Sequence, residues 1–262
     1  MLGSGHSYAK PEFLMDREVI LVTFNYRLGV FGFLSTEDDV VPGNNGLKDQ
    51  VLALKWVQDN IASFGGNPGS VTLTGLSAGA SSVHLHYLSV MSKGLFHRGF
   101  SQSGVALNSF TIQEQALNKA KILADAVGCP SASSQVLVQC LKQRNYLHLV
   151  TKTSLFYGYT FTPFSPFAPV VEKGSNPFLN KNPFELLVNG DVQDLPWISS
   201  NTAHEGMFPG AFLYKNLEEI DEKWEDIARF LLDYNYTLPR TEWKSTAAKI
   251  KQFYLGDDKI SP

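Results

Sequence analysis

Residues 64–79 read FGGNPGSVTLTGLSAG, and this stretch decides the fold. Residues 75–79, GLSAG, form the pattern G-x-S-x-G around Ser77. The β-branched run of residues 70–74 before it predicts a buried strand, and residues 80–88 after it are compatible with a helix. A serine on a sharp turn between a strand and a helix forms a nucleophile elbow, which raises the hydroxyl clear of the backbone.

The elbow needs small neighbours and a donor for a developing oxyanion. We expect Gly75 and Gly79 to be required because a Cβ at either position would crowd the crossing of strand and helix. The N–H of Ala78, at the helix N-terminus, is the expected oxyanion donor. The alternative is a plain glycine-rich turn in which Ser77 serves as the helix N-cap.

Composition limits the classes of function. The chain has 262 residues, 44% hydrophobic and 18% charged, which suits one globular domain over residues 1–262 or part of a larger one. A net charge of −3 without a basic block gives no reason to expect a nucleic-acid partner. No apolar run is long enough to span a membrane, and the N-terminus lacks the apolar core of a signal peptide.

The remainder of the chain suggests strands alternating with helices, a βαβ plan. Strands are predicted at residues 19–26, 98–104 and 195–201, and the first, continuously apolar, should be buried on both faces of a parallel sheet. Residues 29–45 and 143–170 are expected to be loops. Helices are predicted over residues 47–61, 116–127, 217–231 and 242–254.

Several segments of the chain resemble the type B carboxylesterase and cholinesterase family, most closely its insect-type carboxylesterases. The residues that carry the resemblance are FGG at 64–66 with the elbow, NYRLG at 25–29, GNNGLKDQ at 43–50, QSG at 102–104 and AHEG at 203–206. The resemblance implies the α/β-hydrolase fold, with a mostly parallel central sheet and helices on both sides. It also implies hydrolysis of carboxylic esters through an acyl-serine intermediate.

The resemblance assigns site residues around Ser77. Glu205 matches the acidic member of the family's catalytic triad, with an ordinary loop carboxylate as the alternative. Ser103 matches a serine that supports this acid, with a turn residue at a strand end as the alternative. Leu76 stands where cholinesterases carry a glutamate, so an uncharged small-molecule ester is the expected substrate, without cofactor or metal.

The catalytic base is missing from this constellation. None of the six histidines follows Glu205, and His84 lies about 10 Å from Ser77 along a helix. His204 would need an acid upstream of it. In the family, the triad histidine and a glycine-rich oxyanion turn lie beyond Pro262 and before residue 3. We therefore expect a chain truncated at both ends, with little activity alone; a non-catalytic adhesion module or an inactive fragment is the alternative.

Two features bear on the compartment. Cys129 and Cys140 have ten residues between them, and from the residues alone they could be free thiols or a disulfide. The resemblance implies the disulfide, because the spacing matches a disulfide loop of the family. Residues 235–237, NYT, form a glycosylation sequon at Asn235. Together they favour a secreted or ER-lumenal protein.

Overall fold

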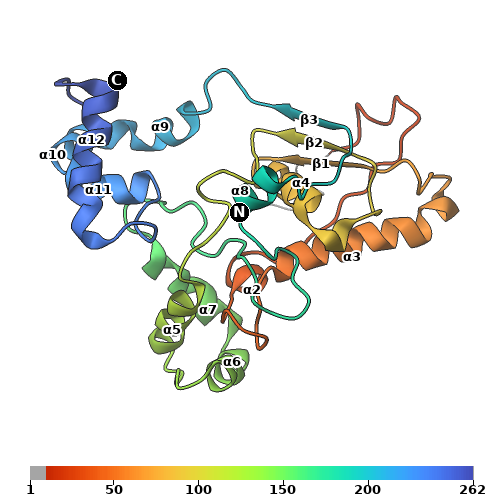
Figure 1. Cartoon of the computed structure of the whole chain (residues 1–262), viewed down its shortest axis with the longest axis horizontal. Coiled ribbons are helices and arrows are strands. Elements are labelled where there is room, and N and C mark those ends of the chain that lie inside the picture. The colour runs from red at the N-terminus through yellow and green to blue at the C-terminus, as the bar shows by residue number, and fades with distance from the viewer. Residues whose placement is uncertain (1–9, 262) are drawn as a thin grey trace.

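The computed structural model describes residues 10–261, and a parallel sheet lies at their centre (Figure 1). Its strands are β1 (Thr72–Leu76), β2 (Arg98–Gln102) and β3 (Trp197–Ser200), in the order β1-β2-β3. All neighbours pair in parallel, with Gly75 opposite Ser101 and Ser101 opposite Ser199. β2 and β3 lie within the runs predicted for them, and β1 begins two residues later than its predicted run.

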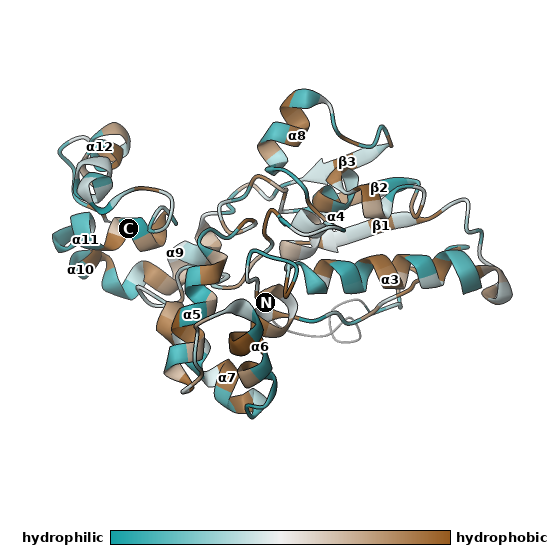
Figure 2. Cartoon of the chain, turned by 60° about the horizontal axis from the view of Figure 1, so that its bottom comes forward, coloured by the Kyte–Doolittle hydropathy of each residue, from teal (hydrophilic) through white to brown (hydrophobic). Residues whose placement is uncertain are grey.

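Helices flank this sheet, as expected for an α/β fold. They are α3 (Asn45–Asn60), α4 (Ala78–Leu88) and α8 (Pro183–Asn189). α4 packs against β1 and β2, and buried Val83 and Tyr87 of α4 meet Leu54 of α3 and Phe96 in one apolar cluster. Apolar and polar bands alternate along α3 (Figure 2), as burial of one helical face requires.

The amphipathic pattern of residues 47–61 is confirmed. The predicted core positions of this helix are all buried: Leu47, Val51, Leu54, Val57 and Ile61. A 3-10 turn (Ile61–Phe64) continues α3, and Gly65 ends it with a φ of 82°, a left-handed conformation that glycine adopts at little cost.

The strand predicted at residues 19–26 is wrong. This segment pairs with no strand among the described residues, and Val19 and Ile20 are 51% and 44% exposed. A cavity of about 910 Å³ is lined by this segment on one side and by β1, α3 and α4 on others. An apolar, β-branched run becomes a strand only when another backbone supplies its hydrogen bonds, and here β1 does not.

A second correction concerns residues 29–45, which contain the short helix α2 (Gly29–Phe33) before the expected loop begins. The predicted helix α5 (Ala116–Ala126) is confirmed, and Gly128 follows it with a φ of 67°. The sequence analysis did not predict α6 (Ser134–Lys142) or α8. The loop predicted over residues 143–170 is wrong in part, because the segment contains α7 (Tyr146–Lys152). α5, α6 and α7 share the largest apolar cluster with α2 and α3, through residues such as Val30, Leu47, Leu123, Leu137 and Leu149.

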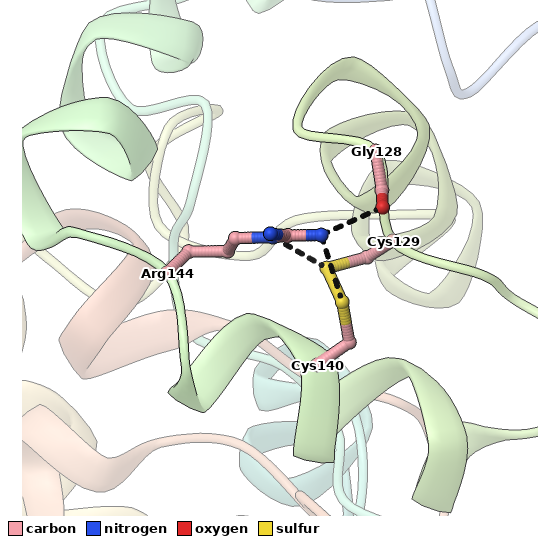
Figure 3. The surroundings of a disulfide bond; sticks show 4 residues. All are labelled: Gly128, Cys129, Cys140 and Arg144. Atoms are coloured by element: carbon pink, nitrogen blue, oxygen red, sulfur yellow. Dashed lines mark hydrogen bonds between the residues drawn. A yellow bond between two sulfur atoms is a disulfide. The ribbon is translucent and has the colours of Figure 1, made fainter.

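The disulfide implied by the family resemblance is present. Cys129 and Cys140 are bonded, and the bond ties the end of α5 to α6 (Figure 3). The Arg144 guanidinium covers it, donating hydrogen bonds to both sulfurs at 3.3 and 3.4 Å and to the Gly128 carbonyl at 2.8 Å.

The C-terminal helices gather at the opposite end of the molecule from α3 (Figure 1). They are α9 (Met207–Leu213), which was not predicted, α10 (Leu217–Glu222), α11 (Trp224–Leu231) and α12 (Trp243–Leu255). The single helix predicted over residues 217–231 is wrong in one respect, because it breaks at Lys223 (φ −106°, ψ 20°). Ala228, Tyr234 and Ala247 form a small core between α11 and α12.

The remaining helical turns are short 3-10 segments, at Val90–Ser92, Thr153–Phe156, Tyr214–Asn216 and Arg240–Glu242. None of the helices within residues 10–261 has the length and apolar character needed to cross a membrane.

Candidate active site

The three candidate residues that follow the strands lie at one edge of the sheet. Ser77 follows β1, Ser103 follows β2 and Glu205 comes a few residues after β3. Because the strands are parallel, their carboxyl ends meet at this edge, where α/β folds bind their ligands. Backbone hydrogen bonds continue the ladder past the strands, from Ser77 N–H to Gln102 at 2.8 Å and from Ser103 N–H to Ser200 at 2.7 Å.

Ser77 adopts the backbone conformation of a strained turn. It joins β1 directly to α4, with φ 56° and ψ −118°. A positive φ is rare for a residue with a Cβ and persists only where the surrounding structure imposes it. Ser77 is exposed, and its hydroxyl makes no capping hydrogen bond to α4, so the N-cap alternative finds no support in the geometry.

The glycines around the turn differ in importance. A Cβ added to Gly75 would overlap the backbone of Gly79, and one added to Gly104 would overlap the carbonyl of Ser77. These two positions therefore permit the close approach of β1, β2 and α4. The expectation for Gly79 is wrong, because a Cβ at Gly79 would meet nothing within 4 Å.

The N–H of Ala78 is positioned as an oxyanion donor would be. It begins α4, it is half-buried, and no acceptor for it lies within residues 10–261. Its role as donor stays a prediction. The segment of residues 3–8, at which the family match begins, and His6 within it lie outside the described residues.

Two groups act on Glu205. Its carboxylate accepts a hydrogen bond from the backbone N–H of Thr202 at 2.7 Å, and the side chain of Ser103 also favours its ionised form. These interactions lower the pKa of Glu205 below its usual value, with the Thr202 backbone as the largest cause. The carboxylate is exposed and ionised near neutral pH, as required of a group that orients a base.

The contact of Thr202 with Glu205 was not predicted from the sequence. Its N–H is satisfied by a glutamate three positions later, which is the back-bonding half of a capping box. The T-x-x-E spacing of residues 202–205 was the available signal.

The two histidines nearest to Ser77 in sequence are structural. His84 accepts a hydrogen bond from Ala106 N–H at its Nδ1 and contacts Trp197, with ring centroids 4.4 Å apart and the rings tilted by 37°. His86 lies between Ser92 Oγ, at 2.6 Å, and Gln50 Oε1, at 2.8 Å. Burial lowers the pKa of His84 to about 4 and that of His86 to about 3, so both rings are neutral.

The other described histidines are no closer to the chemistry. His97 accepts a hydrogen bond from Val71 N–H at 3.2 Å, and His148 lies exposed on α7. His204 stands in the turn beside Glu205, and its ring has no hydrogen-bond partner within the described part of the chain. Across residues 10–261, no imidazole lies within hydrogen-bonding distance of the Ser77 hydroxyl.

Two further candidates lie on the surface. Leu76, directly before Ser77, is 63% exposed at the same edge of the sheet. Asn235 of the sequon is half-buried in the turn between α11 and α12.

Comparison with known proteins supports the fold. A solved structure of juvenile hormone esterase from Manduca sexta, with OTFP covalently attached, superposes with a TM-score of 0.82 at 30% identity. The match covers 100% of this chain and 50% of that one. The fold is accordingly the α/β-hydrolase fold that the sequence resemblance implies.

The sequence relatives of this chain are esterases. A carboxylic ester hydrolase of Bombus ignitus is 47% identical over 262 residues, 98% of this chain and 46% of the relative. Venom carboxylesterase-6 of Apis mellifera is 46% identical over 257 residues, 97% of this chain and 46% of the relative. The chain thus spans about half the length of the curated relatives it matches. Because the carboxylesterase family model also matches residues 1–261, the chain belongs to the carboxylesterase family.

Proposed function

We propose that this chain carries the nucleophile and the acid of a serine carboxylesterase. The observation that supports this most strongly is the exposed Ser77 at a positive φ beside a Glu205 that Ser103 and Thr202 hold in place. Family membership supports ester bonds as the class of bond cleaved.

In the proposed reaction, Ser77 Oγ attacks the carbonyl carbon of the ester and forms a tetrahedral intermediate. The N–H of Ala78 stabilises the oxyanion, and the alcohol leaves to give an acyl-serine that water then hydrolyses. Glu205 stays ionised and orients the base. We assign the base to a histidine outside residues 10–261, because no imidazole in that range lies within hydrogen-bonding distance of the Ser77 hydroxyl.

The substrate in this proposal is an uncharged carboxylic ester. Leu76 puts an exposed apolar side chain next to the nucleophile, at the position where cholinesterases carry a glutamate. Without a carboxylate there, a quaternary ammonium ester gains no charge pairing at this position.

The compartment is proposed to be extracellular or the ER lumen, with a glycan on Asn235. The disulfide between Cys129 and Cys140 supports an oxidising environment. The relative named as a venom carboxylesterase supports the same assignment.

The experiment that tests this function is the release of p-nitrophenol from p-nitrophenyl butyrate by residues 1–262. A serine hydroxyl without its base is a weak nucleophile, so we expect slow release of up to one equivalent as Ser77 is acylated. Release should vanish in Ser77→Ala and persist in His204→Ala. Turnover at ordinary esterase rates that depends on both residues would make His204 the base, and release undiminished in Ser77→Ala would refute the proposal.

A further inference from the structure

A cationic and aromatic pocket lies at the C-terminal end of the molecule, away from Ser77. Its volume is about 440 Å³, within the range of small-molecule sites. α11, the turn that follows it and the start of α12 form one side, and residues 155–158 form the other. The residues that characterise it are Tyr157, Arg229, Phe230, Asn235, Arg240 and Trp243.

Arg229 is fixed in this pocket by aromatic rings rather than by acids. Its guanidinium lies 4.4 Å from the centroid of the Phe230 ring and 4.5 Å from that of Trp243. Its Nε is buried and has no hydrogen-bond partner within the described residues. A buried donor without an acceptor costs about 1–3 kcal/mol, and more when it is charged, so an acceptor from outside would be favoured here.

Arg240 adds a second positive charge. It lies over the Trp243 ring at 5.7 Å and is exposed. Neither arginine takes part in the ion pairs found among residues 10–261, and no Asp or Glu lines the pocket. The pocket therefore presents two guanidiniums that no carboxylate of its own lining neutralises.

We propose that this pocket binds an amphiphilic carboxylate, an organic acid with an apolar chain or ring. Guanidinium groups match the planar geometry of a carboxylate and can bind it through two parallel hydrogen bonds. Leu155 and Phe230 supply apolar surface for the rest of the ligand. Asn235 also lines the pocket, but the core sugars of a glycan on it are uncharged and would not neutralise the two arginines. This site goes beyond the ester chemistry proposed for Ser77.

The test is calorimetric titration of residues 1–262 with sodium decanoate below its micelle concentration. We expect saturable binding at one site per chain, weakened at least tenfold in Arg240→Gln and in Arg229→Gln. Arg240 is exposed, so its variant should fold even if Arg229→Gln does not. Decanol, which has the chain without the charge, should bind at least tenfold more weakly than decanoate.

Arg98→Gln is the matched control. This substitution also removes one positive charge. Arg98, however, lines the large apolar cavity beside β1 and donates a hydrogen bond to Ser70. Affinity for decanoate should be unchanged in this variant. Binding that Arg98→Gln weakens while Arg240→Gln does not would place decanoate in the other cavity and overturn the proposal. Equal binding of decanol, or no binding of decanoate, would overturn it as well.

Discussion

The side chain of Ser103 lowers the pKa of the Glu205 carboxylate, although the two residues follow different strands. Parallel pairing of β2 with β3 brings the two loops together, and Ser103 N–H continues the ladder to Ser200. The contact is therefore produced by sheet topology rather than by local sequence.

This contact predicts the titration of Glu205. In Ser103→Ala, the pKa of Glu205 should rise, because one of the donors that favour the ionised form is lost. It should stay below the usual value, because the Thr202 backbone still donates. Carbon-13 NMR titration of the glutamate carboxyls measures the shift, and Glu205→Gln identifies the resonance. An unchanged pKa in Ser103→Ala would show that the hydroxyl does not act on this carboxylate.

The elbow predicts opposite outcomes for two glycines that look alike in the sequence. Gly75→Ala should lower the free energy of unfolding by about 1–3 kcal/mol, the usual cost of forcing a methyl group into packed structure. Gly79→Ala should change stability by less than about 1 kcal/mol, since its Cβ faces open space in a helix. Urea unfolding of the two variants compares them directly, and equal effects would contradict the geometry.

The buried histidines predict a loss of stability in mild acid. Below a pH of about 6.5 the unfolded chain binds a proton at His84 and at His86 that the folded chain does not bind until about pH 4 and about pH 3. Stability should therefore fall as pH falls through this window, by about 1.4 kcal/mol per pH unit for each histidine.

Unfolding free energies at several values between pH 6.5 and 4.5 test this slope. His86→Gln should make the slope shallower, whereas His148→Gln, at an exposed position, should leave it as it is. If both variants retained the original slope, the acid sensitivity would come from other groups.

The disulfide predicts a measurable contribution to stability. Replacing Cys129 and Cys140 by serine should lower the free energy of unfolding by on the order of 3 kcal/mol, because the cross-link reduces the number of conformations open to the unfolded chain. Chemical denaturation with and without a reductant checks this. Reductant should destabilise the original protein and have no effect on the double variant; equal stability of the two proteins without reductant would contradict the prediction.

The parts of the fold that depend on neighbouring residues were predictable from sequence. The elbow is specified by residues 70–88, and α3 by its apolar face, so both lie where the pattern indicates. The segment of residues 19–26 was misassigned because a strand also needs a distant partner, which periodicity does not report. The break at Lys223 was likewise invisible in an apolar repeat that continues across it.

The residues of the candidate site also differ in how far the local sequence identifies them. Ser77 was identified from its own flanks, whereas Glu205 and Ser103 were identified only through the family resemblance. The Ala106 contact of His84 and the Gln50 contact of His86 come from residues 22 and 36 positions away in sequence. The pairing of Arg229 with Trp243 depends on how α11 meets α12, which no local motif encodes.

The most direct test of the account is covalent labelling of Ser77. The full-length protein that carries residues 1–262 is incubated with a fluorophosphonate probe, and the adduct is mapped by mass spectrometry beside Ser77→Ala and the exposed control Ser245→Ala. The account predicts an adduct on Ser77 that is absent from Ser77→Ala and unchanged in Ser245→Ala. An adduct on another residue, or equal labelling of Ser77→Ala, would contradict it.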